Sequence, residues 1–187
     1  MSRATRAEIA ERFSKVRSTT EALCETLSAE DTAAQSMPDA SPVKWHLGHT
    51  SWFFDTFVIA RGGSRPLRPE YSALFNSYYE AFGPRIAREA RGLLSRPALA
   101  SVLGYRRSVT EHVSRLLDLP SQDESDLLAM IELGVNHEEQ HQELILTDIK
   151  HLFAQNPLNP AYRTDVRERR PHRAEPRRLR HIDGGRS

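Results

Sequence analysis

The sequence predicts an all-α fold, a four-helix bundle with a long ordered loop between its second and third helices. Apolar side chains recur at helical spacing in four segments, and no segment alternates between apolar and polar residues over a useful length. Prolines lie near the ends of these segments, where they interrupt a helix least. At 187 residues the chain is long for one domain and short for two. We therefore expect one helical core with extensions at its ends.

The first helix is expected over residues 5–28. Its apolar residues, from Ile9 to Leu27, follow one another at steps of three, four and seven, which places them on one helix face. Residues 28–40 are small, polar and acidic, so we expect a loop there.

The second helix is expected to begin at Ser41 and to run to about residue 60. Ser41 offers an N-cap oxygen, and Pro42 suits the first helical position. Residues 64–96 then contain several prolines and glycines, which predicts a long loop with at most short helical turns. Its aromatic residues argue against disorder.

The third helix is expected from Pro97 to Leu119, and the fourth from Gln122 to Ala154. The fourth is the longest and carries a predicted buried stripe. That stripe comprises Leu127, Ile131, Leu144, Ile145, Ile149 and Leu152.

Composition argues against a membrane protein, a secreted protein and a nucleic-acid-binding protein. Hydrophobic residues make up 39% of the chain and charged residues 27%, and no apolar run approaches the length of a membrane span. The first ten residues resemble no secretion signal, so we expect a soluble, cytoplasmic protein without a membrane partner. Residues 163–187 hold nine arginines and four carboxylates but no interleaved aromatics, which argues against nucleic acid as a partner.

Cys24 is the single cysteine of the chain. One thiol excludes an internal disulfide and any cysteine-based zinc finger. We expect Cys24 to be a small buried residue on the first helix.

The strongest chemical signal is the pair His137 and His141 in the fourth helix. Histidines four residues apart lie on one helix face, so both imidazoles can reach one metal ion. Two surface histidines at this spacing by chance are the alternative.

A second cluster contains His46 and His49 among many aromatic residues of the second helix. A buried histidine needs a partner for its ring nitrogens, and a metal is one such partner. Their spacing leaves open which of the two faces the fourth helix, and a structural role for either is an equal alternative.

The segment His137-Glu-Glu-Gln-His141 also matches the HExxH motif of zinc metalloproteases, in which the glutamate is a general base. Such an enzyme needs a third ligand and an edge strand that aligns the peptide. His151 lies off the ligand face, and no strand is predicted. The metalloprotease is therefore the least favoured of the three functions that we consider for this chain.

Four segments together carry a resemblance to a known family. They read SPVKWHLGHTSWFFD at residues 41–55, LFNSYYE at 74–80, RGLLSRP at 91–97 and HEEQHQE at 137–143. In this order they resemble the N-terminal DinB-like domain of ergothioneine-biosynthesis sulfoxide synthases. The likeness covers most of residues 5–162.

The resemblance implies a non-haem iron(II) enzyme that uses O₂ to join the sulfur of cysteine or γ-glutamylcysteine to the imidazole of hercynine. It implies three metal ligands, His49, His137 and His141, with zinc or nickel as alternatives to iron. It also implies that Gln140 hydrogen-bonds the hercynine imidazole. Arg88 and Arg91 are candidates for pairing with a substrate carboxylate, with plain surface charge as the alternative. No catalytic residue is assigned.

Members of this family carry a second, sulfatase-modifying-factor-like domain, which supplies the catalytic tyrosine. Residues 181–187 resemble the opening strand and glycine turn of that domain. We therefore expect a helical metal-binding domain over residues 1–162 and a basic linker or tail over 163–187. A separate chain is the expected source of the second domain. The alternative is a stand-alone DinB-like metal protein or a metal-dependent thiol transferase.

Overall fold

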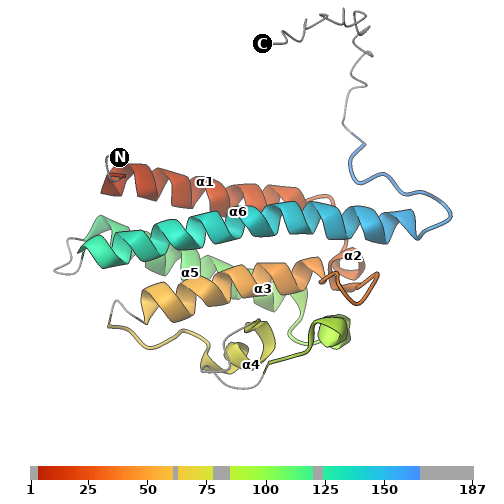
Figure 1. Ribbon diagram of the computed structural model, residues 1–187, viewed down its shortest axis with the longest axis horizontal. Helices are drawn as coiled ribbons and strands as arrows, with labels where there is room; N and C mark the ends of the chain where they lie inside the picture. The colour runs from red at the N-terminus through yellow and green to blue at the C-terminus, as the bar shows by residue number, and fades with distance from the viewer. Residues whose placement is uncertain (1–3, 61–62, 78–84, 120–123, 165–187) are drawn as a thin grey trace, which may run out of the picture.

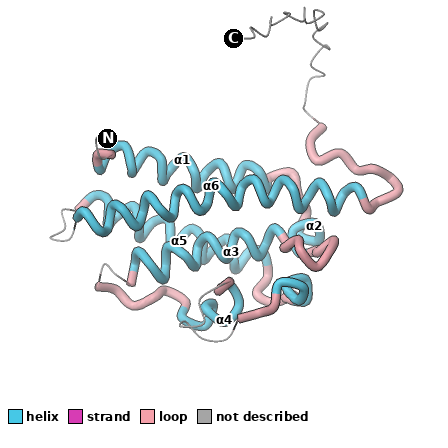
Figure 2. Tube along the Cα trace, in the orientation of Figure 1, coloured by secondary structure: helices cyan, strands magenta, loops and turns pink. Residues whose placement is uncertain are grey.

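A computed structural model describes residues 4–60, 63–77, 85–119 and 124–164. Four long helices form its body (Figure 1). They are α1 (Arg6–Cys24), α3 (Val43–Phe54), α5 (Leu99–Asp118) and α6 (Glu124–Ala154). The described residues contain helices and loops and no strand (Figure 2), so the all-α prediction is confirmed. None of the described helices is long and apolar enough to cross a membrane.

The longest helix, α6, holds the bundle together. It packs against α1 on one side and α3 on the other, while α5 contacts both of these helices (Figure 1). The core between them contains the largest fully buried apolar side chains. These are Phe13, Leu47, Trp52, Phe54, Ile59, Phe75, Ile131, Ile145 and Ile149.

Capping determines where the first helices begin and end. Thr5 and Glu8 form a capping box at the start of α1, with the Thr5 side chain accepting from the Glu8 backbone N–H. Ser28 and Asp31 form a second capping box, which starts a short helix, α2 (Ala29–Ala33). The prediction of one helix to Ser28 followed by a plain loop was therefore wrong in detail. The Ser28 side chain caps the helix that follows it.

The start of α3 also differs from expectation. Pro42 is its N-cap and makes no side-chain hydrogen bond, whereas Ser41 Oγ accepts from Arg91 Nη1 at 2.8 Å. Ser41 is therefore not the helix cap. Its hydroxyl joins the helix start to the long loop instead.

The end of α3 continues as a π-helix, Asp55–Ile59. The buried carboxylate of Asp55 accepts hydrogen bonds from the Tyr105 hydroxyl and the Leu67 backbone N–H, both at 2.8 Å. One carboxylate thus ties the long loop to α5. π-helical segments often occur near functional sites.

In its described residues, 63–77 and 85–96, the long loop contains only short helical pieces, as predicted. They are a 3-10 helix at Pro69–Tyr71, α4 (Ser72–Phe75) and a second 3-10 helix at Arg88–Leu93. Tyr78, Tyr79 and Phe82, expected to order the loop, lie outside the described residues.

The predicted buried stripe of α6 is confirmed for Leu127, Ile131, Ile145 and Ile149, and Leu152 is partly buried against the core. The prediction was wrong for Leu144, which is 45% exposed. Leu144 lies instead at the cavity beside the histidines. Its apolar side chain therefore faces an opening and not the core. The predicted start of the helix at Gln122 lies outside the described residues.

A buried ion network joins α1, α5 and α6. Glu138 Oε2 accepts from Arg17 Nη1 at 2.8 Å, Glu138 Oε1 accepts from Arg106 Nη2, and the Thr20 hydroxyl lies 2.7 Å from the same Oε1. All three charged side chains are almost fully buried. Burial alone would raise the pKa of Glu138, but the two guanidiniums outweigh it and lower this pKa to about 2.

We expect Glu138→Ala to destabilise the fold by about 3–5 kcal/mol, because it leaves two buried guanidiniums without their shared carboxylate. Urea unfolding followed by circular dichroism measures this. Glu132→Gln is the control: it breaks the Arg12–Glu132 ion pair, which joins α1 and α6 at the surface. The two side chains are 39% and 37% exposed. Its cost should be about 0–1 kcal/mol. Equal costs for the two variants would contradict a structural role for the buried network.

The same network makes stability depend on pH in a defined direction. The pKa of Glu138 lies near 2 in the folded protein and at an ordinary 4.5 otherwise. Its contribution is therefore complete above pH 4.5 and is lost as the pH falls towards 2. Glu138→Ala should lack this part of the acid transition.

Candidate metal centre

Three histidines from two helices meet at one point of the bundle. His49 of α3 and His137 and His141 of α6 each offer a ring nitrogen, and these three atoms all lie within 4.8 Å of one another. Two of the histidines are buried and His137 is half-buried. The structure therefore brings together the three side chains that the resemblance implied as ligands.

The long loop fixes the orientation of His49. Its Nδ1 lies 2.6 Å from the carbonyl oxygen of Phe75 and must carry the proton, since a carbonyl only accepts. In a neutral ring the Nε2 lone pair is then available to a metal ion. Gly48 permits this contact, because a Cβ there would lie 2.3 Å from the Phe75 ring.

The distance between two of the ring nitrogens fits a shared ion. His49 Nε2 and His137 Nε2 are 3.2 Å apart. Two nitrogens bound to one ion at about 2.0–2.1 Å, at adjacent octahedral or tetrahedral positions, lie roughly 2.8–3.4 Å apart. In addition, His137 Nδ1 is buried and has no hydrogen-bond partner among the described residues. The nitrogens of His49 and His137 thus already lie at the separation that one divalent ion requires.

His46 is buried beside the cluster but is not one of the three converging histidines. Its Nδ1 lies 2.7 Å from Nδ1 of His141, and its Nε2 lies 3.0 Å from Oδ2 of Asp148. Sequence spacing left open which of His46 and His49 faces the fourth helix. In the structure both contact α6, and His49 is the one that joins the converging trio. Sequence reasoning missed Asp148 as its partner, although Asp148 lies seven residues after His141 and hence on the same face of α6.

Burial sets the protonation of the cluster. Loss of hydration lowers the pKa of His137 to about 4 and also lowers the pKa values of His49 and His141. The imidazoles are therefore neutral near pH 7. Neutral imidazole is the form that binds metal, so no proton has to leave before an ion enters.

The cluster opens into a cavity of about 220 Å³. Gln140 of α6 and Arg88 of the long loop line it and are exposed. Arg91 also lines it but is buried: its guanidinium lies 3.4 Å above the Trp45 ring and donates to Ser41. The Trp45 ring in turn stacks on His49, with ring centroids 4.6 Å apart. The geometry thus separates the two arginines, with Arg88 at the opening and Arg91 in the wall.

Glu138 does not take part in this cavity. Its side chain is 0% exposed and both oxygens are bound within the ion network with Arg17 and Arg106. A metalloprotease needs this glutamate beside the metal-bound water. The structure therefore argues against the metalloprotease alternative.

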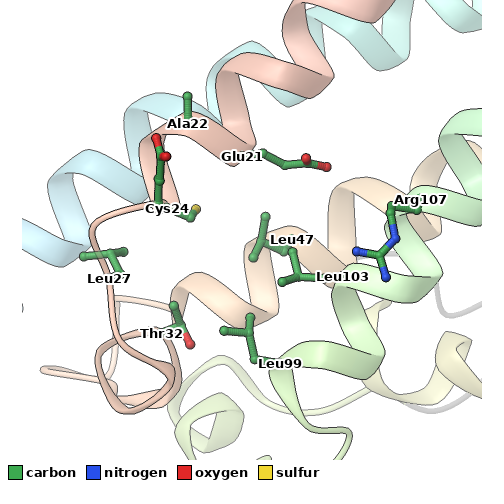
Figure 3. Close-up of a pocket in the computed structure, with 10 residues that line it drawn as sticks. Glu21, Ala22, Cys24, Leu27, Thr32, Leu47, Leu99, Leu103 and Arg107 are labelled. Carbon is green, nitrogen blue, oxygen red and sulfur yellow. The ribbon is translucent and has the colours of Figure 1, made fainter.

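A second cavity, of about 530 Å³, lies between α1, α3 and α5 (Figure 3). Leucines from the three sides, among them Leu47 and Leu103, surround the partly exposed thiol of Cys24. Burial raises the pKa of Cys24 to about 11. The cysteine is therefore a protonated thiol near neutral pH and a poor nucleophile.

We expect Cys24 to react with iodoacetamide at pH 8 about a hundredfold more slowly than an ordinary thiol, because its thiolate fraction is that much smaller. Mass spectrometry of timed samples measures the rate, which should climb steeply as the pH approaches 11. The same chain in 6 M urea supplies the unperturbed rate. A native rate equal to the unfolded rate would contradict the pKa shift.

Comparison with known proteins identifies the family of the chain. Among curated proteins, no sequence matches it. The family model of the DinB superfamily matches residues 12–145, which include α3 and the histidine pair of α6. This match spans most of the chain and contains all three converging histidines. The chain belongs to the DinB superfamily.

Proposed function

We propose that His49, His137 and His141 hold one iron(II) ion and that this domain is the metal-binding part of an ergothioneine-type sulfoxide synthase. The observation that carries the proposal is the convergence of three neutral imidazoles on one point beside an open cavity. Three neutral ligands leave the full 2+ charge on the ion and leave coordination positions open. The four sequence segments that resemble the synthases support this particular member of the superfamily.

The proposed reaction joins a thiol to the imidazole ring of hercynine. A thiol S–H bond and a ring C–H bond are broken, a C–S bond forms, and one O₂ supplies the sulfoxide oxygen and the oxygen of one water. The four electrons that reduce O₂ come from the thiol and the ring. When bound, iron(II) would supply binding of the sulfur as thiolate and reduction of O₂.

The residues around the cavity suit the binding of such substrates. Gln140 lies between the two histidines of the pair and is exposed at the cavity, where its amide can hydrogen-bond an imidazole. Arg88 stands at the opening and offers the planar donor fork that carboxylates prefer. Arg91 keeps Trp45 against His49 and so shapes the wall. We propose Arg88, more than Arg91, as the partner of a substrate carboxylate.

The proposal includes a second, sulfatase-modifying-factor-like domain that completes the pocket and supplies the catalytic tyrosine. Two exposed leucines near the cavity support the packing of another domain against this region. They are Leu144 beside the cavity and Leu93 on the 3-10 helix that carries Arg88. The expected tail of residues 163–187 lies almost wholly outside the described residues.

A stand-alone metal protein, or a metal-dependent thiol transferase, is the second candidate. It is favoured by the fact that the three histidines and the groups that hydrogen-bond them all lie within residues 41–148 of this domain. Such a protein would bind the metal and a thiol but would form no C–S bond to hercynine.

We expect anaerobically purified wild-type chain to contain about one iron per molecule, measured by inductively coupled plasma mass spectrometry. His49→Ala, His137→Ala and His141→Ala should each lose it, because two imidazoles hold a divalent ion much less tightly than three. His151→Ala is the matched control, since His151 lies on the same helix but contacts Ser36 away from the cluster. Metal-free wild type, after reconstitution with iron(II) and with zinc, would refute the proposed site.

Turnover separates the two candidate functions. With iron(II), hercynine, O₂ and either cysteine or γ-glutamylcysteine, we expect the sulfoxide product by mass spectrometry once the second domain is added. Arg88→Ala should raise KM for the substrate about tenfold or more with a smaller effect on kcat, since a charge-assisted hydrogen bond contributes about 1.5–3 kcal/mol. A metal-loaded chain that yields no product with the second domain present would support the second candidate.

A further inference from the structure

A continuous chain of polar contacts leads from the three-histidine cluster to the start of α3. His141 Nδ1 lies 2.7 Å from His46 Nδ1, and His46 Nε2 lies 3.0 Å from Asp148 Oδ2. The backbone N–H of Ser41 donates to the same Oδ2 at 2.9 Å. We propose that Asp148 and His46 are positioning residues that fix the tautomer of His141, so that its Nε2 faces the ion.

The position of each proton follows from what each atom can do. The carboxylate of Asp148 only accepts, so His46 Nε2 carries a proton and donates it. The neutral His46 ring then has a lone pair on Nδ1. Since His141 Nδ1 lies within hydrogen-bond distance of this lone pair, it carries the proton between them. A neutral His141 has its remaining lone pair on Nε2, which is the atom left to bind a metal.

The reverse arrangement would disable the site. If His46 carried its proton on Nδ1, it would donate to His141 Nδ1 and move the His141 proton to Nε2. That nitrogen could then not bind an ion. The Asp148 carboxylate prevents this arrangement, because the Nε2 of His46 must face it as a donor.

The other cluster histidine with a described partner follows the same rule. Phe75 O accepts from His49 Nδ1 and leaves His49 Nε2 as the ligand atom. His49 is oriented by a backbone carbonyl, which no substitution can remove, whereas His141 depends on two side chains. His141 is therefore the ligand whose tautomer can be changed by mutation.

The first test reads the tautomer directly and needs no metal. Long-range ¹H–¹⁵N correlation of the metal-free protein distinguishes a protonated Nδ1 from a protonated Nε2 in each ring. We expect His141 to be protonated at Nδ1 and His46 at Nε2 in the wild type. The opposite pattern in the wild type would overturn the proposal without any variant.

Paired variants separate positioning from stability. Asp148→Leu and His46→Leu remove the acceptor and should give His141 as a mixture of both tautomers. Asp148→Asn and His46→Asn keep an oxygen acceptor and should restore the Nδ1-protonated form at least in part. Glu143→Gln, an exposed acid five residues from Asp148 on α6, should change nothing. A purely structural role would lower stability in the leucine variants but leave the His141 tautomer unchanged, and that result would overturn the proposal.

The second test measures zinc and cobalt(II) affinity by competition with a chelator. We expect about 10–100-fold weaker binding in the two leucine variants, partial recovery in the two asparagine variants and no change in Glu143→Gln. Equal affinity in the leucine variants and the wild type would overturn the positioning role.

This inference rests on the proposed metal site, but the two can fail separately. Wild-type chain that binds no metal refutes the site, whatever the tautomer of His141. Wild-type chain that binds one ion through His141, with unaltered tautomer and affinity in the leucine variants, refutes only the role of Asp148 and His46.

Discussion

The buried ion network around Glu138 is the interaction on which the rest of the structure depends. It fixes the rotation of α6 about its own axis, because Glu138 must face Arg17 on α1 and Arg106 on α5. Adjacent residues of a helix point about 100° apart, so His137 is turned away from that network and towards α3. His141, one turn further on, shares this direction. The charged network thus places the histidine pair opposite His49, although no hydrogen bond between described residues joins its charged side chains to the three histidines.

Charge is divided between the two sides of α6. The network side holds two guanidiniums and the carboxylate of Glu138 in nearly complete burial, and the half-exposed carboxylate of Glu21 pairs with Arg106, so the charges there balance. The three histidines on the other side are neutral, because loss of hydration lowers the pKa values of His49, His137 and His141. A metal ion entering there meets no carboxylate from Glu138, which is engaged elsewhere. The resulting centre would keep a 2+ charge, which suits the binding of anionic substrates such as a thiolate.

Sequence spacing predicted part of this arrangement, and the remainder depends on contacts between helices. Periodicity gives the direction of a side chain within one helix, so the four helices and the pairing of His137 with His141 could be predicted. It gives no relation between helices, and so the choice between His46 and His49 stayed open. The buried arginines were missed because charged residues ordinarily lie at the surface. The short helix α2 was missed because its start depends on the local Ser28 capping box. The role of the three histidines as ligands stays a prediction.

The meaning of the HExxH motif is decided by residues far from it in the sequence. The spacing of the two histidines allows a metal to bind, whatever the glutamate does. In a metalloprotease the glutamate must reach water at the metal, whereas here Arg17 and Arg106 hold the Glu138 carboxylate in the core. A pair of guanidiniums on two other helices therefore converts a potential general base into a structural ion. Any general base or acid used at this centre must then come from a residue other than Glu138.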